Sequence, residues 1–123
     1  MTGIELIAAE RERQINAEGW TAAHDDRHIE NELARAAICY LEAANMLDGL
    51  PRVPTFEDKI AIREAILAQG TCTPHWPFED RWFKFDHAQQ CRVKAGALTA
   101  AEIDRDQRYS ASQALADTGT RKD

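Results

Sequence analysis

Apolar residues recur every three or four positions along most of the chain, which is the period of an α-helix with one buried face. The first such stretch predicts a helix from Thr2 to about Ala17. Thr2 and Glu5 have the capping-box spacing, and Gly19 can end the helix in a left-handed conformation. One face of this helix collects four apolar residues and one arginine: Ile4, Ile7, Ala8, Arg11 and Ile15.

A second helix is predicted from about Ile29 to Leu47, because apolar residues again recur at helical spacing. Its buried face would contain Leu33, Ala36, Ala37, Tyr40, Ala44 and Leu47. The small alanines would let another helix approach closely, either in the same chain or in a second copy of it, so a homo-oligomer stays open. The segment from Asp48 to Pro51 holds a glycine and a proline and ends the helix.

A third helix is predicted to begin at Thr55, with Asp58 three residues later, and to stop at Gly70. Its apolar side would contain Ile62, Ile66 and Leu67. A last, long helix is predicted to begin at Asp86, with Gln89 at the capping-box spacing. Its buried face would contain Val93, Ala97, Ala100 and Ile103.

Gly96 lies inside the last helix, where a glycine costs roughly 1 kcal/mol relative to alanine. We therefore expect a neighbouring segment to pack tightly against it. Polar residues dominate from Asp106 onward. Residues 1–105 are predicted to form a single helical domain, and residues 106–123 a polar tail that frays unless a partner or an extended helix orders it.

A loop rich in tryptophan and proline, from Thr71 to Pro77, separates the third helix from the last. It runs into an aromatic segment that contains Trp76, Phe78, Trp82, Phe83 and Phe85. No part of the chain shows the alternation of a β-strand. The predicted fold class is all-α, a small bundle of three to four helices with a Trp/Pro-rich loop segment.

Charge and composition narrow the functions that such a bundle can have. The formal net charge of -6 argues against non-specific binding of nucleic acid, which needs a basic surface. No apolar run approaches the roughly 20 residues that span a bilayer, so we expect no membrane partner and a cytoplasmic protein. The cysteines form no CxxC pair, which predicts buried or neutral thiols at Cys39, Cys72 and Cys91.

The segment from Glu18 to His28, which we call the polar junction, is the richest in directional polar side chains. It contains Trp20, His24, Asp25, Asp26 and His28 directly before the alanine-rich helix. Such clusters more often serve a ligand, a metal or a partner than a core. The two histidines are four residues apart, which is a spacing of metal ligands on a helix, but no third ligand lies at a recognisable spacing in the sequence. We therefore assign no metal and no cofactor, and interpret Asp25 or Asp26 as the cap of the second helix.

Four acidic residues on two helices form a second candidate site. Glu30, Glu32, Glu102 and Asp104 offer the oxygen ligands that magnesium prefers. The all-α nucleotide pyrophosphohydrolases of the MazG type bind magnesium through acids in ExxE and ExxD spacings. This chain departs from that pattern, because its acids stand two residues apart and point to different helix faces. A solvated helix surface is the simpler interpretation.

Aromatic and cationic residues form a third candidate site. Trp20, Trp76 and Trp82 offer flat surfaces, although a small domain also uses tryptophans as core anchors. Lys84, Arg92 and Lys94 offer donors for a phosphate or a carboxylate. A small anionic or nucleotide-like ligand would suit this set. The predicted ligand-binding residues are Trp20, His24, Asp25, Asp26, His28, Trp76, Trp82, Lys84 and Arg92. No Gly-x-Ser-x-Gly and no Gly-rich phosphate loop is present, so no catalytic residue is predicted.

Several segments resemble a family of small proteins encoded by bacteriophages and prophages. The matching segments are Glu10-Arg11-x-Arg13-Gln14-Ile15, Glu18-Gly19-Trp20-Thr21, His24-Asp25-Asp26-x-His28, Glu32-Leu33-Ala34-x-Ala36-Ala37, Trp76-Pro77-Phe78, Trp82-x-Lys84, Arg92-x-Lys94-Ala95-Gly96-Ala97-Leu98 and Ala101-Glu102-Ile103-Asp104-Arg105. They cover most of the chain except residues 45–74 and the tail. The resemblance implies a protein of the bacterial host cytoplasm and assigns it no activity.

The junction is also similar to the ryanodine-receptor repeat domain. In that domain a Gly-Trp-Thr element precedes acidic residues, a histidine and a leucine, as Gly19-Trp20-Thr21, Asp25-Asp26, His28 and Leu33 do here. The chain departs from the pattern at Ile29, where the domain has proline, and it lacks the Pro-Tyr that follows. This similarity implies a small module that binds a nucleotide-derived ligand.

We derive three functional hypotheses from these observations. In the first, a phage-derived protein sequesters a nucleotide or a host immune messenger: Trp20 and Trp82 stack on its planar group, Asp25 accepts its donors, and Lys84 and Arg92 bind its anionic group. In the second, the acidic surface docks onto a host defence effector and inhibits it. In the third, the four acidic residues hold magnesium in a nucleotide pyrophosphohydrolase.

Overall fold

The computed structural model describes residues 1–28, 30–69 and 76–120, and this part of the chain is all-helical. The helices are α1 (Gly3–Glu18), α2 (Ala22–Asp25), α3 (Glu32–Asp48), α4 (Phe56–Gln69) and α5 (Ala88–Thr120), with one 3-10 turn, η1 (Asp80–Trp82), before α5. The predicted all-α bundle is confirmed. The short helix α2 was not expected and forms inside the polar junction.

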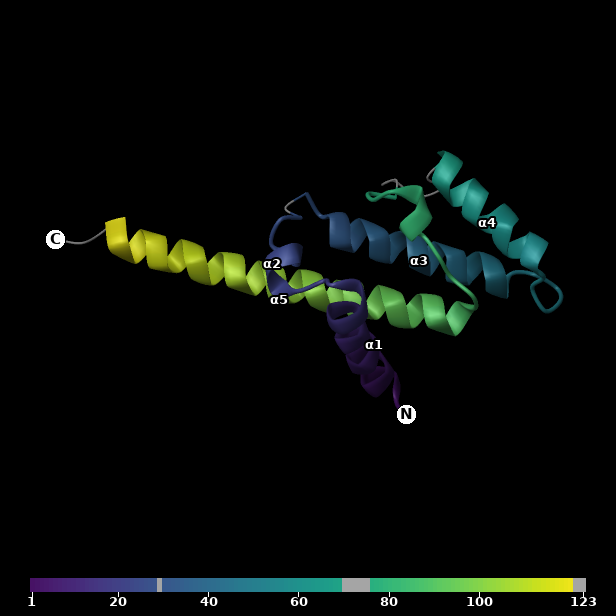
Figure 1. The fold of residues 1–123 in the computed structure, drawn as a ribbon, viewed down its shortest axis with the longest axis horizontal. Coiled ribbons are helices and arrows are strands. Elements are labelled where there is room, and N and C mark those ends of the chain that lie inside the picture. The colour runs from purple at the N-terminus through teal and green to yellow at the C-terminus, as the bar shows by residue number, and fades with distance from the viewer. Residues whose placement is uncertain (29, 70–75, 121–123) are drawn as a thin grey trace.

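Helices α3 and α5 run antiparallel, side by side, through the centre of the molecule (Figure 1). Helix α1 crosses α5 steeply, and α4 packs against α3 on the side away from α5. The segment from residue 76 to residue 87 passes over α3 and leads the chain back to the start of α5. The C-terminal half of α5 extends beyond all the other helices (Figure 1).

The core lies mainly between α3, α5 and the aromatic segment. All six residues predicted for the buried face of the second helix are at most 3% exposed, so that prediction is confirmed. They belong to one cluster with Ile66 of α4, Phe83 of the aromatic segment and Leu98 of α5. The alanines of α3 are therefore used within one chain, where they let α5 approach closely.

Gly96 marks the place where α1 crosses α5. A Cβ atom at this position would lie 2.5 Å from Cδ1 of Ile7, so the tight packing expected from the sequence is confirmed. Two other predicted core residues are corrected. Ile4 is 82% exposed, because α1 contacts the bundle only beyond its first turn, and Ile103 is 53% exposed, because the buried face of α5 passes through Leu98, Ala101 and Arg105 instead.

Local capping predictions hold at two helices and fail at two others. The reciprocal hydrogen bonds between Thr2 and Glu5 begin α1, and Gly19 ends it with φ 74°. Thr55 and Asp58 exchange the same bonds before α4. The stop predicted at Gly70 lies outside the described residues.

The predicted starts of α3 and α5 are wrong. Asn31, with φ 62° and no side-chain capping bond, stands before α3, so neither Asp25 nor Asp26 caps it. His87 stands before α5, where its Nδ1 accepts a hydrogen bond from the Gln90 amide. Gln90, rather than Gln89, then accepts from the Asp86 amide.

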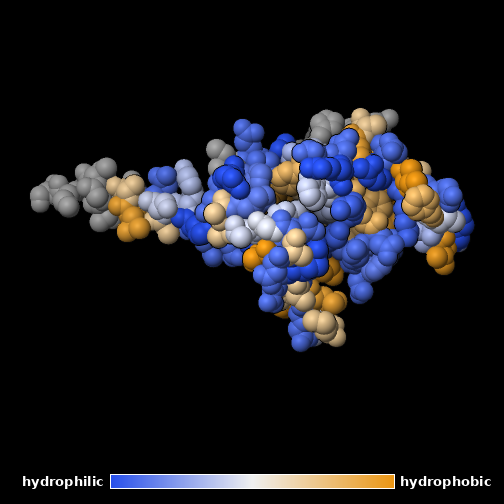
Figure 2. Space-filling model, in the orientation of Figure 1, coloured by the Kyte–Doolittle hydropathy of each residue, from blue (hydrophilic) through white to orange (hydrophobic). Residues whose placement is uncertain are grey.

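The predicted boundary at residue 105 falls inside a continuous helix. Helix α5 runs through it to Thr120, so in the described residues the extended helix replaces the expected fraying. Tyr109 and Leu115 on this part are 58% and 75% exposed. Figure 2 shows a mainly hydrophilic surface, with exposed apolar side chains also gathered over α4 and the loop before it: Val53, Phe56 and Ile60. None of the described helices is long and apolar enough to cross a membrane.

Cys39 and Cys91 are buried, as predicted for inert thiols, and Cys72 lies outside the described residues. Burial raises the pKa of the Cys91 thiol to about 11. The folded thiol thus keeps its proton to higher pH than the unfolded one. Its contribution to stability is complete below the unfolded pKa and is lost as the pH rises through the folded value.

We expect a Cys72→Ser variant to react slowly with Ellman's reagent at pH 8 while folded, because both remaining cysteines are buried and burial also raises the pKa of the Cys91 thiol. Release of the thionitrobenzoate anion, followed by its absorbance, measures the reaction. In urea the same sample should titrate two thiols rapidly. Equally fast labelling with and without urea would contradict the burial.

Candidate functional site

The polar junction between α1 and α3 is shaped by a sequence of local backbone features. Gly19 turns the chain at the end of α1. Thr21 then accepts a hydrogen bond from the His24 amide and begins α2. Asn31 in the left-handed conformation redirects the chain into α3. These turns fold eleven residues back upon α1, so that side chains adjacent in sequence point to different parts of the structure.

Arg11 anchors this junction from α1. Its guanidinium donates to Asp25 Oδ2 at 2.9 Å and to the Trp20 carbonyl oxygen at 3.2 Å. Asp25 is fully buried, and the Arg11 side chain is 15% exposed. The arginine on the apolar face of the first helix is therefore the partner of a buried carboxylate, and its second bond positions the backbone of Trp20.

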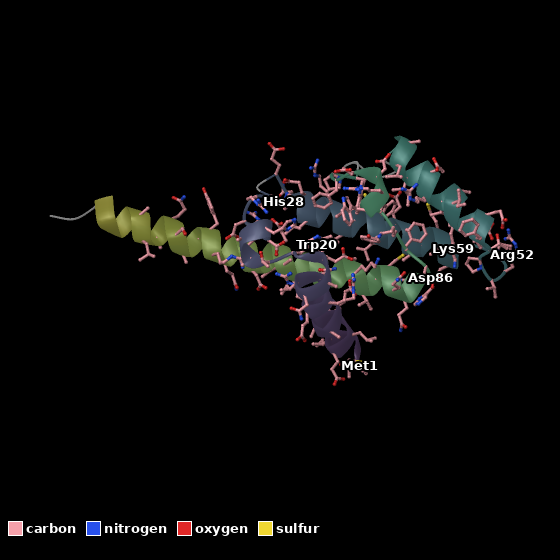
Figure 3. All side chains as sticks on the ribbon, viewed as in Figure 1. Met1, Trp20, His28, Arg52, Lys59 and Asp86 are labelled. Carbon is pink, nitrogen blue, oxygen red and sulfur yellow. The ribbon has the colours of Figure 1, made fainter. Side chains whose placement is uncertain are left out.

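A pocket of about 340 Å³ opens where the junction meets the aromatic segment. Its walls come from α1, α2, the start of α3 and the segment around η1. The lining residues are Glu18, Trp20, His24, His28, Leu33, Phe78, Glu79 and Trp82. Figure 3 shows Trp20 and His28 in this part of the molecule, and Arg52, Lys59 and Asp86 at the opposite end of the bundle. Four of the nine predicted ligand-binding residues thus line one pocket.

The two histidines are each held by a carboxylate. His24 Nδ1 lies 3.3 Å from Asp25 Oδ1, and His28 Nδ1 lies 3.2 Å from Glu32 Oε2. Burial acts to raise the pKa of Glu32, but hydrogen bonds from the Glu30 and Glu32 amides and from His28 outweigh it and lower that pKa. Both imidazoles are consequently fixed in orientation, with their Nε2 atoms 3.4 Å apart.

Aromatic rings form the apolar wall of the pocket. The Trp20 ring lies parallel to His24, with 6.2 Å between centroids, and Phe78 meets His28 edge-on at 5.2 Å. Trp82 is 39% exposed. Arg81 Cζ and Lys84 Nζ lie 4.9 Å and 5.6 Å from its ring centroid. The wall therefore combines flat surfaces inside the pocket with positive charge beside Trp82.

Three predicted ligand-binding residues have structural roles behind or beside the pocket. Asp25 is bound by Arg11 and His24 and does not line it. Asp26 faces the other way and pairs with Arg108 at 2.7 Å, which attaches α2 to α5. Trp76 is 9% exposed and packs against Tyr40 and Phe83, so it is the structural tryptophan that a small domain was expected to contain.

The two cations among the predicted ligand-binding residues lie in different parts of the structure. Lys84 stays beside Trp82. Arg92 binds Asp48 at 2.7 Å, at the end of α3. The pocket lies at the start of α3, beside Leu33, and fifteen residues of helix correspond to about 22 Å. Arg92 is therefore too far away to serve a ligand in the pocket.

Several residues of the site are not among the predicted ligand-binding residues. Glu18, Leu33, Phe78 and Glu79 line the pocket, and Glu32 orients His28. Glu18 stands directly before the helix stop, which is the one local signal that would have marked it. Glu32 and Leu33 follow the polar junction closely in sequence, whereas Phe78 and Glu79 are brought in from a segment about fifty residues further along the chain.

The acidic residues considered for magnesium do not gather. Glu102 is buried in a pair with Arg105 at 2.8 Å, and Glu32 is engaged by His28. Within the described ranges, no group of three or more His, Cys, Asp or Glu side chains is placed to hold a metal ion. The carboxylate site that the pyrophosphohydrolase hypothesis requires is not formed.

No family model matches the chain, and no curated protein or solved structure shows a match. The resemblances to the phage protein family and to the ryanodine-receptor repeat domain stay predictions.

Proposed function

We propose that the chain is a small binding protein that holds a planar, nucleotide-like ligand in the junction pocket. One observation carries this proposal: Trp20 from the polar junction and Phe78 and Trp82 from the aromatic segment surround the same 340 Å³ space as two oriented histidines. A cavity of this volume, mainly aromatic and with a few polar groups, is typical of small-molecule sites.

The polar groups suit the two ends of a nucleotide. Glu18 and Glu79 line the pocket and can accept hydrogen bonds from the amino and ring N–H groups of a base. Arg81 and Lys84, beside the half-exposed Trp82, offer donors for a phosphate outside the pocket. The sequence predicts a resemblance to phage and prophage proteins, and on that prediction we propose sequestration of a host nucleotide messenger as the role of this chain.

Isothermal titration calorimetry with nucleoside monophosphates and cyclic mono- and dinucleotides tests the proposal. Trp82→Ala should weaken binding by about 1–3 kcal/mol, the contribution of one base–aromatic stack, whereas Trp82→Phe should retain most of it. Arg92→Ala is the matched control, because its guanidinium binds Asp48 at the far end of α3. Absence of heat and of any thermal shift across the panel would exclude a nucleotide ligand.

A second candidate, docking to a host protein, is favoured by the projecting half of α5. Tyr109 and Leu115 are exposed there on a helix that passes beyond the bundle (Figure 1). A protein captured at fixed stoichiometry by the full chain, retained by Trp82→Ala and lost with Tyr109→Ala or Leu115→Ala, would support this function over the first. Capture that survives both α5 substitutions would contradict it.

A further inference from the structure

The histidine pair has a geometry that the nucleotide proposal does not use. His24 and His28 present their Nε2 atoms to each other at 3.4 Å, with ring centroids 4.7 Å apart and planes at 64°. At this separation the two nitrogens are within reach of a weak direct hydrogen bond at most. Two nitrogens that each lie 2.0–2.1 Å from a tetrahedral zinc ion are about 3.3–3.4 Å apart.

The outer nitrogens of both rings are already engaged. A carboxylate at Nδ1, Asp25 for His24 and Glu32 for His28, favours the tautomer with the proton on Nδ1. Each Nε2 then carries a lone pair, and the two lone pairs face the same space. A metal ion placed between them would be bound by both lone pairs.

We propose that His24 and His28 bind a transition-metal ion through their Nε2 atoms. The N–H of the second ring nitrogen of a metal-ligating histidine commonly donates a hydrogen bond to a carboxylate. This bond fixes the ring and raises the basicity of the ligating nitrogen. The carboxylates are themselves held, Asp25 by Arg11 and Glu32 by the Glu30 amide. The two ligands are thus preorganised by a further layer of contacts.

The class of metal follows from the donors and the surrounding charge. Imidazole ligands suit zinc, copper and nickel, whereas magnesium and calcium prefer oxygen. The pocket is lined by two carboxylates, Glu18 and Glu79, and by no lysine or arginine, which favours a cation. The histidine side chains are 26% and 22% exposed, so an ion can reach them.

The site would be an open one. Among the residues that the structure describes, no third His, Cys, Asp or Glu joins the pair around one point. The remaining coordination positions would face the pocket and take water or a donor atom of a ligand, as in metal sites that keep a position free. Metal binding needs no organic ligand, so it stands apart from the nucleotide proposal.

Metal titration of the full chain, first stripped with a chelator, tests the proposal. Calorimetry with zinc chloride should show one ion per chain, and magnesium chloride should give no heat. The electron paramagnetic resonance spectrum of the copper(II)-loaded protein should show hyperfine coupling to two imidazole nitrogens. One nitrogen or none would overturn the two-histidine site.

Variants separate this site from adventitious binding to other histidines. His24→Gln and His28→Gln should each weaken zinc binding by more than the about 10- to 100-fold that loss of an outer partner costs, and Glu32→Gln should fall within that range. His87→Asn, which keeps an acceptor before α5, is the matched control and should bind as the unaltered chain does. Circular dichroism confirms that each variant is folded.

The results of these titrations test the metal site and the nucleotide pocket separately. Unchanged zinc affinity in both folded His24→Gln and His28→Gln would overturn the proposal. Nucleotide titrations repeated in the presence of a chelator report on the other proposal separately. Binding of nucleotide without any zinc binding would contradict the metal site alone, and zinc binding without nucleotide would contradict the nucleotide pocket alone.

Discussion

Replacing Arg11 with alanine is expected to lower the free energy of unfolding by about 3–5 kcal/mol, the cost of breaking a buried ion pair from one side. Asp25 would remain fully buried without its charged partner, and the Trp20 carbonyl oxygen would lose its donor. Because native proteins are stable by only about 5–15 kcal/mol, such a loss approaches complete unfolding. Urea denaturation followed by circular dichroism measures it.

Arg13 provides the matched control on the same helix. Its guanidinium pairs with Glu10 and Glu18, but its side chain is 44% exposed. Exposed pairs contribute about 0–1 kcal/mol, so Arg13→Ala should change the urea midpoint little. Equal losses in the two variants would mean that helix propensity or net charge, rather than the buried pair, determines the effect.

Replacing Phe83 with alanine is expected to cost about 3–5 kcal/mol, as for other buried aromatic side chains. Its ring is fully buried and lies 5.2 Å from Tyr40 and 4.7 Å from Trp76, measured between centroids. The truncation would leave a cavity between the aromatic segment and α3. Thermal and urea unfolding of the variant measure the loss.

The neighbouring residue gives the contrasting result. Trp82→Ala removes a larger side chain, but Trp82 is 39% exposed and forms a wall of the pocket. We expect its stability to stay much closer to that of the unaltered chain and its ligand binding to weaken by the loss of one stacking surface. A larger loss of stability in Trp82→Ala than in Phe83→Ala would show that the wall of the pocket is part of the core.

Features that depend on residues within one helical turn were predictable. Thr2 with Glu5, Gly19, and Thr55 with Asp58 act as their spacing indicated, because both partners of each bond lie within four residues. The predicted caps of α3 and α5 were wrong, because in each case a charged side chain distant in sequence binds the carboxylate that was expected to cap the helix. Asp25 is bound by Arg11, and Asp86 is bound by Lys59 at 2.7 Å, so His87 takes the place of Asp86 before α5 (Figure 3).

The types of residue in the candidate site were predictable from the sequence. Which individual residues line the pocket was predictable only in part. Trp20 and Trp82, more than sixty residues apart, do line one pocket with the histidines, as the hypothesis required. Arg92 was grouped with them because it is cationic and belongs to the last helix. Its position near the start of that helix places it beside Asp48, at the opposite end of α3.

The amino-acid sequence by itself determined that this protein is helical, which face of α3 is buried and that a neighbouring segment packs closely against Gly96, whereas the structure showed that this neighbour is α1. The first two depend on the helical periodicity of apolar residues. The third depends on Gly96, because the free-energy cost of a glycine inside a helix must be offset by close packing. Only the tertiary structure decided which polar residues share a pocket. Contacts such as His28 with Phe78, or Arg11 with Asp25, depend on how the chain turns between helices and on how the helices cross, and no local pattern encodes that geometry.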